Sequence, residues 1–354
     1  MKKLIFISII LFICCQVRAQ SVQNDSLMCF DFAVKLVETN YAGYSIKVND
    51  ETVSQYSVMK DSLRTLVAGG ESSMRNAVGC YLAWFRDYHM TDAYGIAEGY
   101  IGGPIEYASF MDYHPQNVSC QVSEDTYLIR LATCSYSARK WVKQAARAFN
   151  KSKCTYLIVD LRGNTGGQNG QADPLIEMLY DKDWFHPGAE IRRSEDNISY
   201  FRNAELIKSD KGWQERIDRV EASTEEYFPL TEGYLIHFKR RGRLPVSAAV
   251  IIDNLTASNA EGLVLSLKNV SDRVTVYGRD NSLGCYDLCD PQWYSLTGYN
   301  FRFRIPTTRT TGLPENGIDA NGLEPDVRIP LDYPKVLTDN IDEWVIWIKD
   351  NLPR

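Results

Sequence analysis

Hydrophobic residues recur at helical spacing in two N-terminal segments, residues 26–39 and 72–87. In the second segment, one face consists of Val78, Tyr81, Leu82 and Phe85. The stretch between the two segments is polar and rich in Tyr, Asp and Ser, and a junction rich in glycine follows at residues 99–104. We therefore expect a small helical cap domain over residues 20–100.

Strand and helix patterns alternate after this junction, and we assign residues 101–354 to a core domain. Thr126–Ala132 alternates like a strand, Ser137–Phe149 has an apolar helical face, and Thr155–Asp160 is a continuous apolar strand. This β–α–β order predicts a buried sheet. Later strands and helices are expected at Val246–Ile252, Ala257–Asn269, Arg273–Gly278, Tyr299–Ile305 and Asp339–Asp350.

A more charged segment, residues 183–245, interrupts the core pattern. It contains one predicted helix, Gly212–Ala222, whose apolar face carries Trp213, Ile217 and Val220. We interpret the segment as an insertion, either a lid over a cleft or a solvated surface element.

The first residues have the pattern of an export signal. Lys2 and Lys3 precede the apolar run Leu4–Cys15, and Val17-Arg18-Ala19 ends with a small residue at the cleavage position. The run is shorter than the roughly 20 apolar residues that span a bilayer. Lipid anchoring at Cys14 or Cys15 is disfavoured because neither follows a small residue. We predict removal of residues 1–19 and a periplasmic or extracellular protein.

Removal of this signal would take away three basic residues and move the net charge from −6 to −9. An acidic chain of this kind argues against nucleic acid and anionic membranes as partners. Seven cysteines would remain, an odd number in a long chain, so a disulfide scaffold is not expected. Cys285 and Cys289 are the closest pair, and no Cys or His spacing is typical of a metal site. We expect no metal and no cofactor.

A glycine-rich loop, Asp160–Gly167, directly follows an apolar strand. Its glycines let the backbone approach a ligand closely and expose N–H groups. A phosphate-binding loop does not fit, because the required G-x-x-x-x-G-K pattern is absent. An ordinary strand-to-loop turn is the alternative.

Ser258 lies where a predicted strand passes through a short turn into a helix. Backbone N–H groups point outward at a helix start and favour negative charge. An acyl-transfer nucleophile suits this position, because the oxyanion it generates lies beside those donors. Ser258 could instead be a simple helix N-cap, which is the commoner role of such a serine.

A nucleophilic serine also needs a base. Lys268 is about 15 Å away along the predicted helix, too far to serve. The four histidines are His89, His114, His186 and His237. His89 lies at the end of the predicted helix 72–87, where an element terminus can present it, but a favourable helix-dipole contact would explain it equally well.

Three separate segments resemble the C-terminal-processing (tail-specific) and tricorn-type serine proteases. Asp87-Tyr-His89 is similar to their D-x-H segment, Tyr156–Gly167 to their strand and D-L-R-x-N-x-G-G loop, and Thr256–Glu261 to their T-A-S-x-A-E nucleophile segment. Two later segments, Gly278–Gly284 and Gly322–Val327, resemble further family signatures. The resemblance implies an α/β (α+β) fold of the ClpP/crotonase type with an N-terminal helical cap.

The resemblance also implies roles for individual residues. Ser258 would be the nucleophile, and His89 the base and then the acid to the leaving amine. Asp319 falls where the family has a late Glu and would support His89, with Glu315 as a second candidate. The N–H of Asn259 and that of Gly166 or Gly167 would form the oxyanion hole.

The comparison with the two branches of the family favours the tricorn-like Ser–His branch. The tail-specific branch uses a lysine in the Gly278–Gly284 segment, and this chain has Leu283 there. Tyr88 replaces the serine that precedes the tricorn histidine, and the interval from His89 to Thr126 is too short for a PDZ domain.

We therefore predict an exported serine-type peptidase that acts on peptide or protein substrates through an acyl-enzyme. The alternative is a diverged, non-enzymatic peptide- or lipid-binding protein on the same fold, as in the retinoid carriers of the eye.

Overall fold

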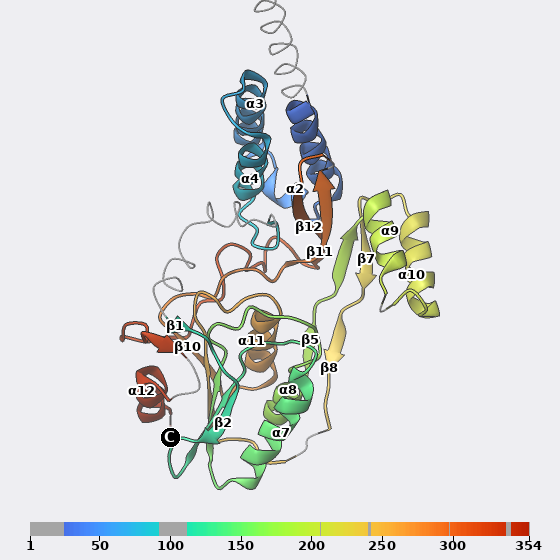
Figure 1. Ribbon diagram of the computed structural model, residues 1–354. Coiled ribbons are helices and arrows are strands. Elements are labelled where there is room, and N and C mark those ends of the chain that lie inside the picture. The colour runs from blue at the N-terminus through green and yellow to red at the C-terminus, as the bar shows by residue number, and fades with distance from the viewer. Residues whose placement is uncertain are drawn as a thin grey trace, which may run out of the picture. The chain divides into compact units, whose positions relative to one another are not determined.

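A computed structural model of the chain describes residues 25–91, 112–205, 207–239, 242–296, 298–337 and 341–353 (Figure 1). The predicted signal at residues 1–19 and the glycine-rich junction at 99–104 lie outside these ranges. The described residues form two compact units. Unit 1 takes them from Met1–Ile101, Glu190–Leu230 and Asp290–Arg309, and unit 2 from Gly102–Ala189, Thr231–Cys289 and Thr310–Arg354.

A six-stranded sheet, in the order β13-β10-β9-β4-β3-β2, forms the centre of unit 2. Only the β2–β3 pair is antiparallel, and the other neighbours run parallel. The strands are β2 (Val118–Gln121), β3 (Thr126–Arg130), β4 (Tyr156–Asp160), β9 (Ser247–Ile251), β10 (Val274–Gly278) and β13 (Val327–Arg328). Every residue of β3 and β9 is buried, as expected for central strands covered on both faces.

Helices cover both faces of this sheet. Three of them, α7 (Ala138–Lys151), α8 (Asp173–Leu179) and α11 (Asn259–Val270), pack in one apolar core with Leu157 of β4. The next residue of that strand, Ile158, points to the other core, with Trp344 of α12 (Glu343–Asn351). Full burial of a Leu- or Ile-sized side chain contributes roughly 1.5–3 kcal/mol to the free energy of unfolding.

Two short strand pairs complete unit 2. β5 (Trp184–His186) pairs antiparallel with β8 (Tyr234–Ile236), and β1 (Asp112–Tyr113) pairs parallel with β14 (Val336–Leu337).

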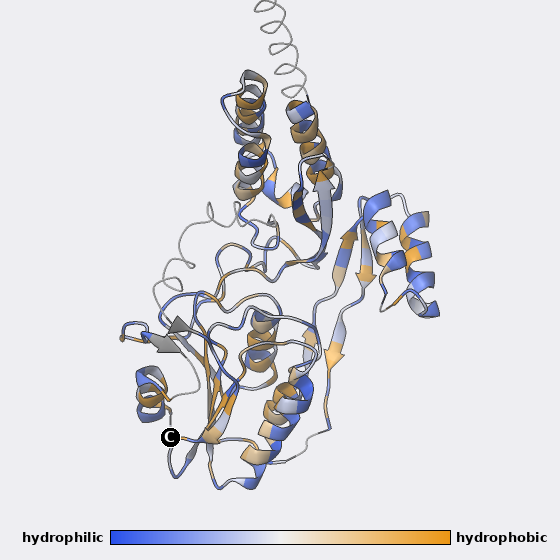
Figure 2. Cartoon of the chain, viewed as in Figure 1, coloured by the Kyte–Doolittle hydropathy of each residue, from blue (hydrophilic) through white to orange (hydrophobic). Residues whose placement is uncertain are grey.

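In the hydropathy colouring, α11 is largely hydrophobic, in agreement with its burial (Figure 2).

Unit 1 contains the N-terminal helices, the helical part of the insertion and most of a second sheet. Its helices are 25–40, α2 (Tyr44–Lys47), α3 (Val53–Gly69), α4 (Met74–Trp84), α9 (Glu195–Asn203) and α10 (Lys211–Ala222). The second sheet has the order β11-β12-β6-β7, from β11 (Leu288–Leu296), β12 (Phe301–Thr310), β6 (Ala189–Arg192) and β7 (Tyr227–Thr231). The N-terminal helices meet through an aromatic cluster in which Phe85 contacts the rings of Tyr41, Tyr56 and Tyr81.

Helix α3 lies in the polar stretch of the predicted helical cap, where the sequence pattern indicated no individual helix. Only Tyr56 and Val67 of its 17 residues are buried, so its apolar periodicity is weak. The helix ends where Gly70 adopts a left-handed conformation with φ of 72°, which glycine allows at no steric cost. None of the helices in the described ranges has both the length and the hydropathy of a bilayer-spanning segment.

Candidate active site

Ser258 occupies a strained position between β9 and α11. Its φ of 55° and ψ of −128° are unusual for a residue with a side chain, and such strain concentrates at functional sites. The turn is held by the buried carboxylate of Asp253, which accepts hydrogen bonds from the backbone N–H groups of Thr256 (2.9 Å) and Gly163 (3.1 Å). Ser258 itself is partly exposed, so this turn is not sealed within the core.

The glycine-rich loop predicted from the sequence packs directly against Ser258. A Cβ atom on Gly166 would lie 2.8 Å from the Ser258 Cβ and 2.9 Å from the Asn259 nitrogen. A Cβ atom on Gly167 would lie 2.5 Å from the Cys134 carbonyl oxygen. Both glycines also have positive φ, at 93° and 139°. Only glycine fits either position, which explains the paired glycines in the sequence.

The backbone amides around Ser258 differ in their partners. The Gly166 N–H donates to Asn164 Oδ1 at 2.9 Å and is therefore already engaged. Within the part of the chain that the structure describes, no acceptor is found for the Gly167 or Asn259 N–H. The Asn259 side chain donates to the Gln168 carbonyl at 2.8 Å and ties the loop to the helix start. Of the three amides proposed from the sequence, Gly167 and Asn259 can thus bind an anion without breaking a bond.

Glu261, three residues after Ser258, has a fully buried carboxylate. It accepts hydrogen bonds from the Ser258 N–H (3.0 Å), the Ser282 hydroxyl (2.5 Å), the Gly284 N–H (2.8 Å) and the Cys285 N–H (2.8 Å). Burial raises the pKa of Glu261 to about 7, although these four hydrogen bonds act in the opposite direction. In the sequence, Glu261 stands out only as the last residue of the nucleophile motif. The Ser-x-x-Glu spacing of a capping box was the signal that could have singled it out.

His89 lies in unit 1, shortly after α4. Its backbone N–H donates to Asp87 Oδ1 at 2.9 Å, and the other oxygen of Asp87 accepts from the Tyr41 hydroxyl at 2.8 Å. Asp87 therefore fixes the backbone at His89, which gives the first residue of the D-x-H segment a structural role.

Asp290, which the sequence analysis did not select, interacts electrostatically with His89 in unit 1. Packing of protein around the Asp290 carboxylate raises its pKa, while the Thr308 hydroxyl, 2.8 Å away, and the charge of His89 act in the opposite direction. About two hundred residues separate Asp290 from His89 in the chain, so no local pattern could have revealed the pair.

Asp319 and Glu315, the acidic candidates from the sequence, lie in unit 2. Asp319 Oδ1 accepts hydrogen bonds from the N–H groups of Tyr286 (3.1 Å) and Asp287 (2.9 Å), and Asp287 accepts from the Asp319 N–H (2.8 Å) in return. This reciprocal arrangement orders the loop around Asp319. Glu315 is exposed.

The first residues of the glycine-rich segment belong to a buried charge cluster. Asp160 lies 2.7 Å from both Arg130 and Arg162, and Asp342 lies 2.8 Å from Arg162. Burial acts to raise the pKa of Asp160, but the two guanidinium groups outweigh it and hold that pKa well below its usual range. Asp342 also caps α12 by accepting from the Trp344 N–H at 3.0 Å. The cluster joins two strands to a helix, and its role is structural.

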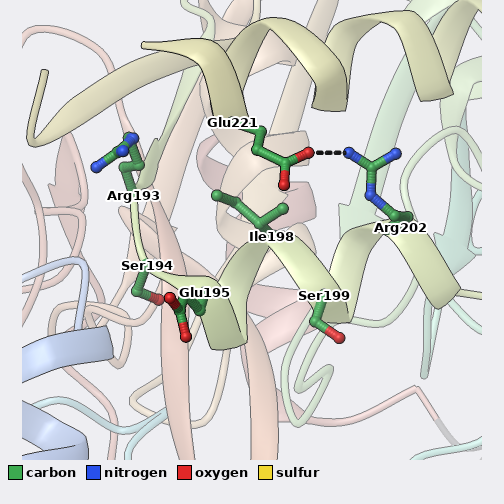
Figure 3. A pocket seen from close by; sticks show the side chains of 7 residues that line it. All are labelled: Arg193, Ser194, Glu195, Ile198, Ser199, Arg202 and Glu221. Carbon is green, nitrogen blue, oxygen red and sulfur yellow. Dashed lines mark hydrogen bonds and ion pairs between the residues drawn. The ribbon is translucent and has the colours of Figure 1, made fainter. Parts of the chain in front are cut away.

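A pocket of about 560 Å³ lies in the insertion between α9 and α10 (Figure 3). Its lining is charged, and Arg202 pairs across it with Glu221 at 2.7 Å. None of the candidate catalytic residues lines this pocket. It therefore gives no support to an active site within the insertion.

Comparisons with known proteins address the family and the fold of the chain. The family model of peptidase family S41 matches residues 125–329. No curated protein sequence matches the chain significantly. Among solved structures, mature CPAF complexed with lactacystin is similar with a TM-score of 0.61 at 12% identity, over 87% of this chain and 94% of the other. A second structure of mature CPAF is similar with a TM-score of 0.60 at 11% identity, over 87% and 93% of the two chains.

The photosystem II D1 C-terminal processing protease is a more distant structural match, with a TM-score of 0.45 at 15% identity over 86% of this chain and 92% of the other. The likeness to the CPAF structures confirms the predicted α/β fold with a helical N-terminal region. The family model covers more than half of the chain and spans both the glycine-rich loop and the Ser258 turn. The chain therefore belongs to peptidase family S41, a family of peptide-hydrolysing enzymes.

Proposed function

We propose that this protein is an exported serine-type peptidase of the tricorn-like branch, with Ser258 as its nucleophile. One observation carries the proposal: Ser258 sits at positive φ on a helix start, with Gly166 packed against it and two amides, Gly167 and Asn259, without an acceptor in the described chain. A serine that served only as a helix cap would need neither the strained backbone nor the adjoining glycine loop.

The chemistry follows from these positions. Ser258 Oγ would attack the peptide carbonyl while His89 takes its proton, and the Gly167 and Asn259 amides would stabilise the resulting oxyanion. His89 would then donate the proton to the leaving amine, and water would hydrolyse the acyl-enzyme by the reverse sequence. The Gly166 N–H already donates to Asn164 and would not bind the oxyanion. Gly166 would contribute instead by its lack of a side chain, which lets the loop approach Ser258.

Leu283 supports the choice of branch. It stands where the tail-specific enzymes have lysine, and its N–H donates to the Thr256 carbonyl at 2.9 Å. This segment therefore lies against the nucleophile turn but carries an apolar side chain there. A histidine base accordingly fits the chain better than a lysine base.

Three carboxylates remain candidates for supporting His89. Asp319 and Glu315 are proposed from the family resemblance. Asp290 is proposed because it interacts electrostatically with His89 within unit 1. The amide variants Asp290→Asn, Asp319→Asn and Glu315→Gln separate them, since the supporting residue is the one whose variant loses activity while keeping the wild-type melting temperature.

Peptide hydrolysis by the chain lacking residues 1–19 tests the proposal. We expect Ser258→Ala and His89→Ala each to lower kcat/KM by several orders of magnitude, because the members of a catalytic triad act as a unit. Matched controls are Ser266→Ala, on the same helix, where the hydroxyl only donates to the Gly262 carbonyl, and His237→Ala, in the exposed Asp183 pair. Both controls should stay within a few-fold of wild type.

A fluorophosphonate probe gives a second readout that needs no knowledge of the substrate. It should label the wild-type protein at Ser258 and leave Ser258→Ala unlabelled. Equal hydrolysis by wild type and Ser258→Ala would exclude the proposed nucleophile. A wild-type protein that neither hydrolyses peptides nor reacts with the probe would instead be a binding protein on this fold.

A further inference from the structure

The carboxylate of Glu261 binds more of the nucleophile's surroundings than a helix cap requires. In a capping box the first-turn Glu accepts only one hydrogen bond, from the N–H of the cap residue, and Glu261 accepts that bond from the Ser258 N–H at 3.0 Å. Its three other donors come from residues 282–285, which follow β10. One buried group therefore holds two segments that are distant in the chain.

The 282–285 segment is itself anchored on both sides. The Leu283 N–H donates to the Thr256 carbonyl at 2.9 Å, within the nucleophile turn, and the Leu323 N–H donates to the Ser282 hydroxyl at 2.6 Å. Gly284 has no room for a side chain, because a Cβ atom there would lie 2.6 Å from the Gly322 nitrogen. These contacts hold the segment, so the position of the Glu261 carboxylate is determined partly from outside its own helix.

The bond from Glu261 acts on the strained residue itself. Ser258 has a φ of 55°, a conformation that persists only where the surroundings over-determine it. Bonds from a backbone N–H to an ionised carboxylate are among the stronger hydrogen bonds in proteins. The direction of the Ser258 Cα–Cβ bond, and with it the position of Oγ, depends on the peptide plane that this bond holds.

We propose that Glu261 is a positioning residue for catalysis, whose ionised carboxylate holds the Ser258 backbone in the conformation that aims Oγ at the substrate. This inference rests on the proposed function of Ser258. In this role Glu261 neither contacts the substrate nor transfers a proton.

Four donors and no cationic partner surround Glu261 in the described ranges. The Tyr286 phenol, which directly follows the 282–285 segment, interacts electrostatically with Glu261. Protonation would turn one carboxylate oxygen of Glu261 into an O–H donor that faces other donors. The hydrogen bond from the Ser258 N–H to Glu261 would then weaken. Because burial raises the pKa of Glu261 to about 7, this loss would begin near neutral pH.

The variant Glu261→Gln tests the proposal, because it keeps the shape but turns an NH₂ group toward two of the four donors. We expect its fluorophosphonate labelling rate and its kcat to fall about 100-fold, as for other small misplacements of reacting groups, with KM within about threefold of wild type. The matched control is Ser266→Ala on the same helix, which leaves all four hydrogen bonds to Glu261 in place and should stay within a few-fold of wild type. A role in folding alone would lower the folded fraction and leave the kcat of the folded protein unchanged.

The outcomes separate this inference from the proposed function. Wild-type labelling and turnover in folded Glu261→Gln would overturn the positioning role and leave Ser258 as the nucleophile. A wild-type protein that is inactive toward both peptide and probe would remove both proposals.

A second measurement decides the case in which Glu261→Gln does not fold. The Ser282 hydroxyl lowers the pKa of Glu261, so its removal should raise that pKa. The acid limb of the pH–labelling profile should then move to higher pH in Ser282→Ala than in wild type. An unchanged acid limb would contradict the proposal.

Discussion

Asp160 and Glu261 are both fully buried acids in unit 2, but the protein surrounds them in different ways. Asp160 lies between the guanidinium groups of Arg130 and Arg162, whereas Glu261 accepts four hydrogen bonds from neutral donors. The pKa of Asp160 is held well below its usual range, and that of Glu261 is raised to about 7. Burial acts in the same direction on both, so the full charges of the arginines make the difference.

One fold therefore uses buried charge in two ways. A carboxylate matched by two guanidinium groups stays ionised at any physiological pH and joins β3, β4 and α12 permanently. A carboxylate matched only by dipoles can change its protonation state near neutrality, and this one is bonded to the nucleophile's backbone. Groups with strongly shifted pKa values cluster at functional sites, and the second arrangement fits that rule.

The largest expected effect in this comparison is on stability and comes from the Asp160 cluster. Arg162→Met removes one of two buried cations and leaves an excess of negative charge, which should lower the free energy of unfolding by about 3–5 kcal/mol. Urea unfolding at pH 7 measures this change. The double variant Arg162→Met/Asp342→Asn restores neutrality and should recover part of the loss. A single-variant change below about 1 kcal/mol would show that the cluster is not stabilised by charge matching.

An intermediate effect is expected for the pH dependence conferred by Glu261. A carboxyl group whose pKa is raised by folding, here to about 7, destabilises the folded state progressively as the pH rises from about 4.5 to 7. Relative to Glu261→Gln, the wild-type protein should therefore lose up to about 3 kcal/mol of unfolding free energy between pH 5 and pH 8. Paired urea titrations of the two proteins at these pH values give the difference. If the difference in unfolding free energy between the two proteins does not change with pH, the four hydrogen bonds fully offset the effect of burial on the pKa of Glu261.

The smallest effect is expected for an exposed ion pair of the same chemical type. Arg64 and Asp31 lie 2.8 Å apart in unit 1, with 51% and 43% of their side chains exposed. Arg64→Met should change the free energy of unfolding by less than about 1 kcal/mol, because water and salt screen the pair. Thermal or urea unfolding of this variant beside Arg162→Met compares the two directly. Equal losses would indicate that burial does not set the strength of these ion pairs.

The central strands and the nucleophile helix could be predicted because their signals are local. Continuous apolar runs predicted β4 and β9, and apolar spacing of three and four residues predicted α11, each to within about two residues of the observed bounds. Helix α3 was missed because it buries only two residues, and β11 was missed because only its first and last residues are buried. Contacts with the rest of the fold stabilise these two elements, and such contacts leave no periodic pattern in the sequence.

The candidate site divides in the same way. The strand–turn–helix at Ser258 and the glycines of the adjoining loop can be predicted from the residues alone, since both depend on backbone conformations that few residue types adopt. The packing of Gly166 on Ser258, the engaged amide of Gly166 beside the open amide of Gly167, and the bonds from residues 282–285 to Glu261 arise only when the chain folds. The fold also brings Asp342, 180 residues along the chain from Arg162, into the charge cluster around Asp160. The periodicity of apolar residues indicates which face of a helix or strand is buried. The partner of a buried polar group depends instead on which distant segments of the chain pack beside it. A local sequence pattern does not contain that information.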